Sequence, residues 1–279
     1  MKAENAFVEF EMDEQDSFPE ICELNIISGG CHLYGYLLSP DKRIAGPYPT
    51  VIMSHGFPGY TTNNDLELAL MRMGCVVIHM NHRGAWGSEG NYLFTNLKDD
   101  LIAIAKWAHN PAIADQYQID RENLFLVGHS MGGQTVLNAA KDLPFIKGVA
   151  AMAAYDIGAA FRYKMEKDLF LMIETEGQCL KMNSASDVYE NALNNQQELS
   201  ILNRYDELAK RNVLLVEATY DVVAPPEKML RPLADKLAEM HGAVTYKAIK
   251  GNHSFVGQRM KLTRLVGKWM EETVHEGGR

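Results

Sequence analysis

Residues 124–133 read Leu-Phe-Leu-Val-Gly-His-Ser-Met-Gly-Gly, an apolar run followed by the pattern G-x-S-x-G. The run is typical of a buried strand, and a helix is expected to follow from Met131. G-x-S-x-G alone would occur by chance in roughly one chain of this composition in ten, so its context carries the interpretation. A serine between a strand and a helix occupies strained backbone, and small residues such as Gly128 and Gly132 let the two elements approach. The Met131 amide would lie at the start of the helix, where it favours an anion.

Short apolar runs and helical stretches alternate along the rest of the chain. Two β-rich segments, 21–27 and 32–38, come first, and Ser28-Gly29-Gly30 between them is typical of a hairpin turn. Six apolar runs follow at 50–54, 75–79, 124–127, 148–153, 213–218 and 244–249. Helical patterns occupy 64–73, 97–109, 131–141, 227–240 and 258–273, the fourth kinked or shortened by Pro232. We therefore predict an α/β fold with a doubly wound, mostly parallel, eight-stranded sheet.

One connection is too long for this alternation. Residues 156–211 contain no strand-like run, but apolar residues recur at helical spacing in them, and Asp187 is placed to cap a helix. We interpret 156–211 as a helical cap inserted after the sixth strand into a core formed by residues 1–155 and 212–279. The connection leaves the sheet at the carboxyl edge, where Ser130 also lies, so we expect the cap to cover the site.

Composition excludes several classes of function. The chain has 279 residues, with 47% hydrophobic and 23% charged side chains, the balance of a folded globular protein. Its formal net charge of −9 argues against a nucleic-acid partner. No apolar run approaches the roughly 20 residues of a membrane helix and no signal-peptide pattern begins the sequence, so we expect a cytoplasmic protein without a membrane partner. Nucleotide-binding glycine motifs are absent, and the four cysteines, which lack CxxC spacing, are interpreted as reduced, mostly buried thiols.

The serine motif and the order of elements resemble the α/β-hydrolase fold family over residues 21–273. That family's order of nucleophile, acid and histidine is matched here by Ser130, by Asp221 after the seventh strand and by His253 after the eighth. In these roles His253 would accept the serine's proton, and Asp221 would orient and stabilise the imidazolium. Asp156, after the sixth strand, is the alternative acid. Asp221 could instead cap a helix and have no catalytic role.

The segment Ser54-His55-Gly56-Phe57-Pro58-Gly59 resembles the family's HG-x-x-G oxyanion loop. The resemblance assigns the amides of Phe57 and Met131 to an oxyanion hole, since Pro58 has no N–H. His55 and His129 are more simply explained as structural residues. Residues 81–90 look like the RG-x-x-x-S-x-G loop of esterases and prolyl-oligopeptidase-like hydrolases, in which Arg83 would hold the loop.

Together the motifs are similar to those of bacterial feruloyl and cinnamoyl esterases. They imply a serine carboxylesterase that cleaves esters of small or aromatic acyl groups through an acyl-enzyme, with no cofactor and no metal site. Candidates for substrate contact are Trp86, Phe161, Phe170 and Tyr189, with packing onto the core as the alternative. A prolyl-oligopeptidase-like aminopeptidase or another amide hydrolase is the alternative enzyme, and a non-catalytic ligand receptor is a third hypothesis. The oligomeric state stays open.

Overall fold

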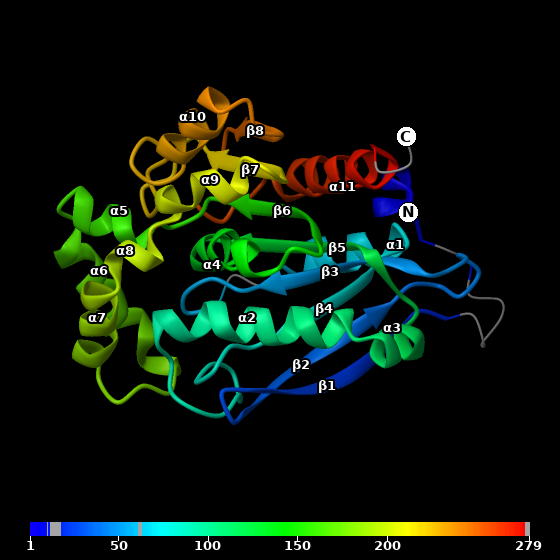
Figure 1. The fold of residues 1–279 in the computed structure, drawn as a ribbon, viewed down its shortest axis with the longest axis horizontal. Coiled ribbons are helices and arrows are strands. Elements are labelled where there is room, and N and C mark those ends of the chain that lie inside the picture. Colours follow the sequence, from blue (N-terminus) through cyan, green and yellow to red (C-terminus); the bar gives the residue numbers. More distant parts are fainter. Residues whose placement is uncertain (10, 12–17, 61–62, 277–279) are drawn as a thin grey trace.

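One eight-stranded sheet runs through the molecule (Figure 1). The structure is a computed structural model that describes residues 1–9, 11, 18–60 and 63–276. The strands are β1 (Glu20–Ser28), β2 (Cys31–Ser39), β3 (Tyr48–Ser54), β4 (Val76–Met80), β5 (Ile119–His129), β6 (Ile146–Met152), β7 (Asn212–Ala218) and β8 (Val244–Ile249). Their spatial order is β1-β2-β4-β3-β5-β6-β7-β8, in which β2 is antiparallel to both neighbours and the pairs from β4 onward are parallel. The predicted mostly parallel α/β sheet is confirmed.

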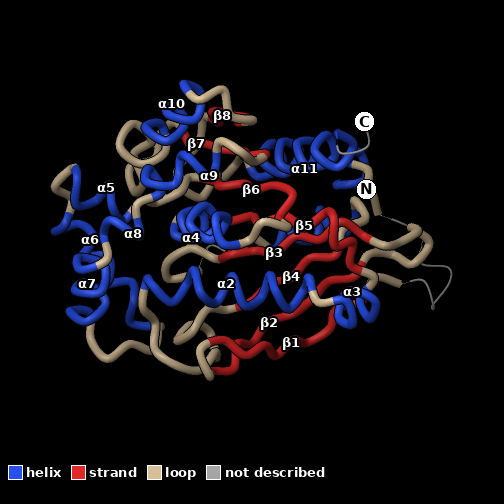
Figure 2. Tube along the Cα trace, viewed as in Figure 1, coloured by secondary structure: helices blue, strands red, loops and turns tan. Residues whose placement is uncertain are grey.

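Helices cover both faces of the sheet, and Figure 2 shows them around the central strands. Side chains of α2 (Phe94–His109), α4 (Met131–Ala139) and α10 (Arg231–Glu239) join an apolar cluster on one face. On the other face, side chains of α1 (Asn64–Arg72) and α11 (Arg259–Glu276) join a second cluster. Every residue of β3 is buried, because both its faces are covered. Short 3-10 turns span Ala3–Phe7, Ala140–Asp142, Gly177–Cys179 and Ile201–Arg204.

Five short helices fill the connection between β6 and β7. They are α5 (Ile157–Arg162), α6 (Glu166–Glu176), α7 (Ala185–Asn194), α8 (Gln196–Leu199) and α9 (Tyr205–Leu208). Helices α5 to α8 lie together beyond the carboxyl ends of the parallel strands, at the left of Figure 1. Leu169 and Val188 pack there in a third apolar cluster with Tyr92. Ile201 and Leu208 instead join the first cluster, which contains side chains of α2, α4 and α10. The apolar contacts of this connection therefore divide near residue 200.

Several local features differ from the sequence expectations. Ser184, not Asp187, caps α7, because its side chain accepts the N–H of Asp187 three residues later. Pro232 shortens its helix rather than kinking it: α10 begins at Arg231, where a missing proline N–H costs no hydrogen bond. Helix α3 (Pro111–Tyr117) was not predicted. The cysteines are free, but Cys75 is the buried one, so the expectation of mostly buried thiols is wrong.

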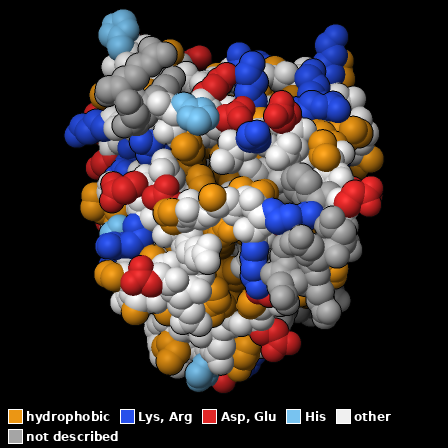
Figure 3. Space-filling model, turned by 90° about the vertical axis from the view of Figure 1, so that its right-hand side faces the viewer, with side chains coloured by type: hydrophobic (Ala, Val, Ile, Leu, Met, Phe, Trp, Pro, Cys, Tyr) orange, Lys and Arg blue, Asp and Glu red, His pale blue; other side chains and the backbone are white. Residues whose placement is uncertain are grey.

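The surface near the two chain ends carries mixed charge. Figure 3 shows this end of the molecule, where acidic and basic side chains alternate over the described residues. Among the helices within the described ranges, none is long and apolar enough to cross a membrane. Ser130 lies between the end of β5 and the start of α4, and therefore at the carboxyl edge of the sheet.

Candidate active site

Ser130 occupies a strained turn between β5 and α4. Its φ of 56° lies in the left-handed region, which residues with a side chain rarely adopt. Its N–H donates to the Met152 carbonyl over 2.9 Å, so the turn is held to the end of β6. A Cβ on Gly128 would lie 2.2 Å from the Gly132 carbonyl oxygen, and one on Gly132 would lie 2.0 Å from a carbonyl oxygen of β3. The two glycines therefore allow the close approach that presents the serine.

Ser130, His253 and Asp221 form a hydrogen-bonded chain. The Oγ of Ser130 lies 2.8 Å from Nε2 of His253, and Nδ1 of His253 lies 2.7 Å from Oδ2 of Asp221. Because a carboxylate can only accept, the proton of the imidazole lies on Nδ1, and Nε2 is free to accept from the serine hydroxyl. Ser130 and Asp221 are both buried. The chain connects a hydroxyl to a base and the base to an orienting carboxylate.

The two candidate acids have different surroundings. The second oxygen of Asp221, Oδ1, accepts the N–H groups of Val223 (2.9 Å) and Ala224 (2.8 Å), which fixes the carboxylate toward His253. Asp156 instead caps α5 by accepting the Gly158 N–H over 2.9 Å. Burial raises the pKa of Asp156 to about 6, although the charge of Arg162 opposes this. The geometry therefore connects Asp221, and not Asp156, to the histidine.

His129 supports the loop of His253 from behind. Its Nε2–H donates to the backbone carbonyl of His253 over 2.7 Å, and the two rings lie 4.8 Å apart. Burial, reinforced by the neighbouring His253, lowers the pKa of His129 to about 3. Near neutral pH the side chain is therefore neutral and holds the loop by a neutral hydrogen bond, as expected of a structural residue.

The segment after β3 forms a wall of the site. His55 donates from Nδ1 to the Gly56 carbonyl over 2.8 Å and accepts the His82 N–H at Nε2 over 3.3 Å. The Gly56 carbonyl and the Phe57 amide belong to one planar peptide, in which the C=O and the N–H point in opposite directions. Fixing the carbonyl therefore fixes the direction of the Phe57 N–H. Within the described part of the chain, no acceptor bonds to that N–H.

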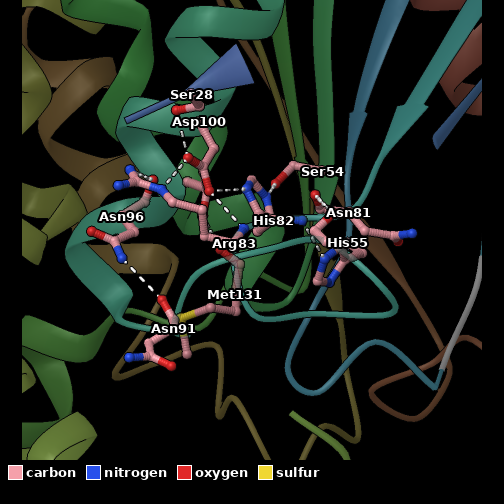
Figure 4. Close-up of polar contacts among 12 residues, drawn as sticks. Ser28, Ser54, His55, Asn81, His82, Arg83, Asn91, Asn96, Asp100 and Met131 are labelled. Atoms are coloured by element: carbon pink, nitrogen blue, oxygen red, sulfur yellow. Dashed lines mark hydrogen bonds and ion pairs between the residues drawn. The ribbon is translucent and has the colours of Figure 1, made fainter. Parts of the chain in front are cut away.

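A buried polar network lies next to this wall (Figure 4). His82 places Nε2 2.9 Å from the Ser54 hydroxyl and Nδ1 3.7 Å from Oδ2 of Asp100. Asp100 also accepts from Ser28 (2.7 Å) and from the backbone N–H (2.8 Å) and Nε (2.6 Å) of Arg83. Burial alone would raise the pKa of Asp100, but the nearby His82 and hydrogen bonds from the Arg83 amide and Ser28 hold it below its usual value. Arg83 thus ties the loop after β4 to α2, as its motif predicts.

A cleft of about 160 Å³ opens beside Ser130 and His253. Residues 56–60 line one side, and Val223, two residues after Asp221, lines another. Helix α6 contributes Met172 and Glu176, which are four residues apart and so share a face of the helix. Among the described lining residues, Glu176 is the one carboxylate. The helical spacing of Met172 and Glu176 is a signal in the sequence, but only the fold shows which face of α6 meets the serine.

The residues predicted to contact substrate lie elsewhere. Tyr189 packs against Phe161 and Phe170, with ring centroids 6.0 and 5.5 Å apart, and none of these three lines the cleft. Trp86 lines a neighbouring cavity of about 310 Å³. The structure brings Ser130, His253, Asp221 and Phe57 together and leaves the aromatic residues of the insertion apart. Over the described ranges, no group of three His, Cys, Asp or Glu residues is arranged to hold a metal ion.

The fold is shared with known esterases and peptidases. Est1E from Butyrivibrio proteoclasticus, solved with ferulic acid bound, superimposes with a TM-score of 0.69 and 18% identity over 90% of this chain and 99% of its own. Brefeldin A esterase, a bacterial homologue of human hormone-sensitive lipase, superimposes with a TM-score of 0.68 and 15% identity over 98% of this chain and 82% of its own. A puromycin-hydrolysing peptidase of Mycobacterium tuberculosis superimposes with a TM-score of 0.68 and 18% identity over 94% of this chain, but over only 41% of the peptidase.

Sequence comparison identifies the family. A search of curated proteins gave no significant match. The family model of the prolyl oligopeptidase family matches residues 62–276, which is more than half of the chain. This match and the shared fold lead to one conclusion: the chain belongs to the prolyl oligopeptidase family and is a serine hydrolase of the α/β-hydrolase fold.

Proposed function

We propose that this protein hydrolyses carboxylic esters through an acyl-enzyme on Ser130. The hydrogen-bonded chain from Ser130 through His253 to Asp221 carries the proposal. His253 accepts the hydroxyl proton at Nε2 while Oγ bonds to the ester carbonyl carbon, and it then gives that proton to the departing alkoxide. Water, activated by the same nitrogen, displaces Oγ from the acyl group and restores the serine. Asp221 stabilises the imidazolium formed in both steps.

The amides of Phe57 and Met131 are proposed to bind the oxyanion that forms on the carbonyl. The His55 contact that orients the Gly56–Phe57 peptide supports the first donor. The position of Met131 as first residue of α4, next to Ser130, supports the second, because the first N–H groups of a helix have no partner within it. Two such donors act mainly in the transition state, where the negative charge is largest.

We further propose that residues 156–200 act as a cap over the site. Met172 and Glu176 of this segment line the cleft beside Ser130. The cleft also contacts Phe57, Pro58 and Val223, which give it apolar wall beside the polar groups of Ser130 and His253. A cleft of about 160 Å³ with such walls suits a short acyl or alcohol chain, which favours small esters.

A second candidate function follows from Glu176. Its carboxylate is exposed on the cleft and makes no hydrogen bond or ion pair within the described residues. A substrate with a free amine next to the scissile carbonyl, such as an aminoacyl amide, would place its ammonium group near this carboxylate. That is the amide-hydrolase alternative, and the same side chain allows it to be tested.

The test compares a para-nitrophenyl acyl ester with an aminoacyl para-nitroanilide, in the parent protein and in Glu176→Gln. The proposal expects kcat/KM for the ester to exceed that for the anilide by at least about 10²-fold and to change less than about twofold in the variant. Glu174→Gln on the same helix is the control, since Glu174 does not line the cleft. A faster anilide reaction that Glu176→Gln lowers severalfold, while Glu174→Gln does not, would favour the amide hydrolase.

A further inference from the structure

A second cavity lies beside the oxyanion segment. It measures about 310 Å³, roughly twice the cleft at Ser130, and Gly59 and Tyr60 line both spaces. The segment 55–60 therefore borders both spaces, which are adjacent at Gly59 and Tyr60. Ser54, His55 and Asn81, which Figure 4 labels together, also line this cavity. An occupant would touch His55 and Gly59, on either side of Phe57, and would lie next to the cleft of Ser130.

Two fixed aromatic rings form the outer wall of the cavity. Trp86 and Tyr60 meet edge to face with centroids 5.7 Å apart, and the indole N–H of Trp86 donates to the Pro58 carbonyl over 2.8 Å. Trp86 has a φ of 46°, a strained value for a residue with a side chain. A Cβ on Gly59 would lie only 2.5 Å from the indole nitrogen, so the glycine lets the ring lie against the loop. The indole is thus held in place although 41% of its surface is exposed.

The floor of the cavity offers hydrogen-bond acceptors. Buried Glu67 accepts from Nδ1 of His79 over 2.8 Å and from the Tyr36 hydroxyl on its other oxygen. In the neutral ring with its proton on Nδ1, His79 presents Nε2 as an acceptor. Neither this nitrogen nor Oδ1 of Asn81 has a hydrogen-bond partner within the described residues. These acceptors, together with the carboxyl group of Glu67, match an uncharged hydroxyl donor rather than an anion.

We propose that this cavity binds the phenolic ring of the substrate. The ring would stack against Trp86 and donate its hydroxyl to His79 or Asn81. A dry apolar cavity of about 150 Å³ is enough for benzene, so 310 Å³ accommodates a substituted ring, whereas the smaller cleft holds the ester group. The assignment to substrate rests on the proposed ester hydrolysis, but ring binding itself does not, and the two are tested separately.

Binding is measured on Ser130→Ala, which holds ligand without turnover. Isothermal titration with para-cresol should give saturable binding, at least about fivefold tighter than that of para-methylanisole, which lacks the hydroxyl donor. Adding Trp86→Leu should weaken the binding of para-cresol about tenfold. Adding Asn81→Leu, which replaces an acceptor, should weaken it about fivefold, and Tyr163→Leu, an exposed aromatic outside both spaces, should have no effect. Circular dichroism and thermal unfolding confirm that each variant is folded.

Two isomeric esters then identify which part of the substrate carries the ring. One is the ethyl ester of para-hydroxyphenylpropanoic acid and the other is the acetate of para-hydroxyphenylpropanol. Trp86→Leu should lower kcat/KM about tenfold, relative to ethyl acetate, for the isomer whose ring reaches the cavity. The ring site is overturned if para-cresol does not bind saturably, or if Trp86→Leu and Asn81→Leu each bind it as tightly as Ser130→Ala alone. Hydrolysis that survives Ser130→Ala overturns the proposed function instead, and normal ring binding with both isomer ratios unchanged overturns the link to substrate.

Discussion

Replacing Asp221 by asparagine is expected to lower kcat for a small ester by about 10⁴-fold while leaving the fold intact. In the parent, Oδ1 of Asp221 accepts the amides of Val223 and Ala224, and Oδ2 faces Nδ1 of His253 at 2.7 Å. Asparagine can keep its oxygen on the two amides, so the loop should stay in place. Its NH₂ group then faces Nδ1 of His253, and two donors oppose each other.

The imidazole escapes this conflict by moving its proton to Nε2. Nε2 is the atom that must accept the proton of Ser130, 2.8 Å away, so the base is lost. A loss of about 10⁴-fold corresponds to ~5.4 kcal/mol in the activation free energy. The assay is steady-state hydrolysis of para-nitrophenyl acetate at pH 7.5, with thermal unfolding as the check on folding.

Asp156→Asn is the matched control, because it makes the same substitution at the other candidate acid. We expect it to retain activity within about threefold, since Asp156 caps α5 and does not contact His253. More than a tenth of the parent activity in Asp221→Asn, or an equal loss in Asp156→Asn, would refute the reasoning.

Further predictions concern stability and the oxyanion wall. Burial raises the pKa of Asp156 to about 6 in the folded chain, against about 3.9 when unfolded, so folding favours its protonated form. The parent should therefore lose up to ~3 kcal/mol of stability as the pH rises from about 4 to about 6. Chemical denaturation at several pH values measures this loss, and Asp156→Asn should lack it because asparagine does not titrate. His82→Phe removes the partner of Ser54 and Asp100, so it should lower the free energy of unfolding by ~1–3 kcal/mol. Calorimetry should show this as a lower unfolding temperature. His55→Phe removes the Nδ1–H that fixes the Gly56 carbonyl, so it should lower kcat about tenfold with KM changed less than about twofold, because the Phe57 amide acts mainly in the transition state; an unchanged kcat would contradict the role of His55.

The fold could be predicted from the sequence because its signals are local. Each buried strand is a short apolar run, and G-x-S-x-G places the sharp turn at Ser130. Ser130, Asp221 and His253 each follow a strand, and parallel strands bring their carboxyl ends to one edge. Helix α3 was missed because Pro111 and the short length of the helix hide its periodicity.

The surroundings of Ser130 could not be predicted in the same way. An aromatic residue in the insertion can face the core or the serine, and periodicity does not distinguish these two faces. Phe161, Phe170 and Tyr189 pack with one another, while Met172 and Glu176 line the cleft. The network of Ser28, His82 and Asp100 also joins segments far apart in the chain, so it emerges only from the three-dimensional arrangement.

Covalent labelling of Ser130 tests the central claim most directly. A fluorophosphonate probe, followed by digestion and mass spectrometry, should place the label on the peptide that contains Ser130 and on that hydroxyl. Ser130→Ala should take up no label and should hydrolyse esters at least about 10³-fold more slowly than the parent. Equal labelling of Ser130→Ala, or hydrolysis by that variant at the parent's rate, would contradict the assignment of Ser130 as the nucleophile.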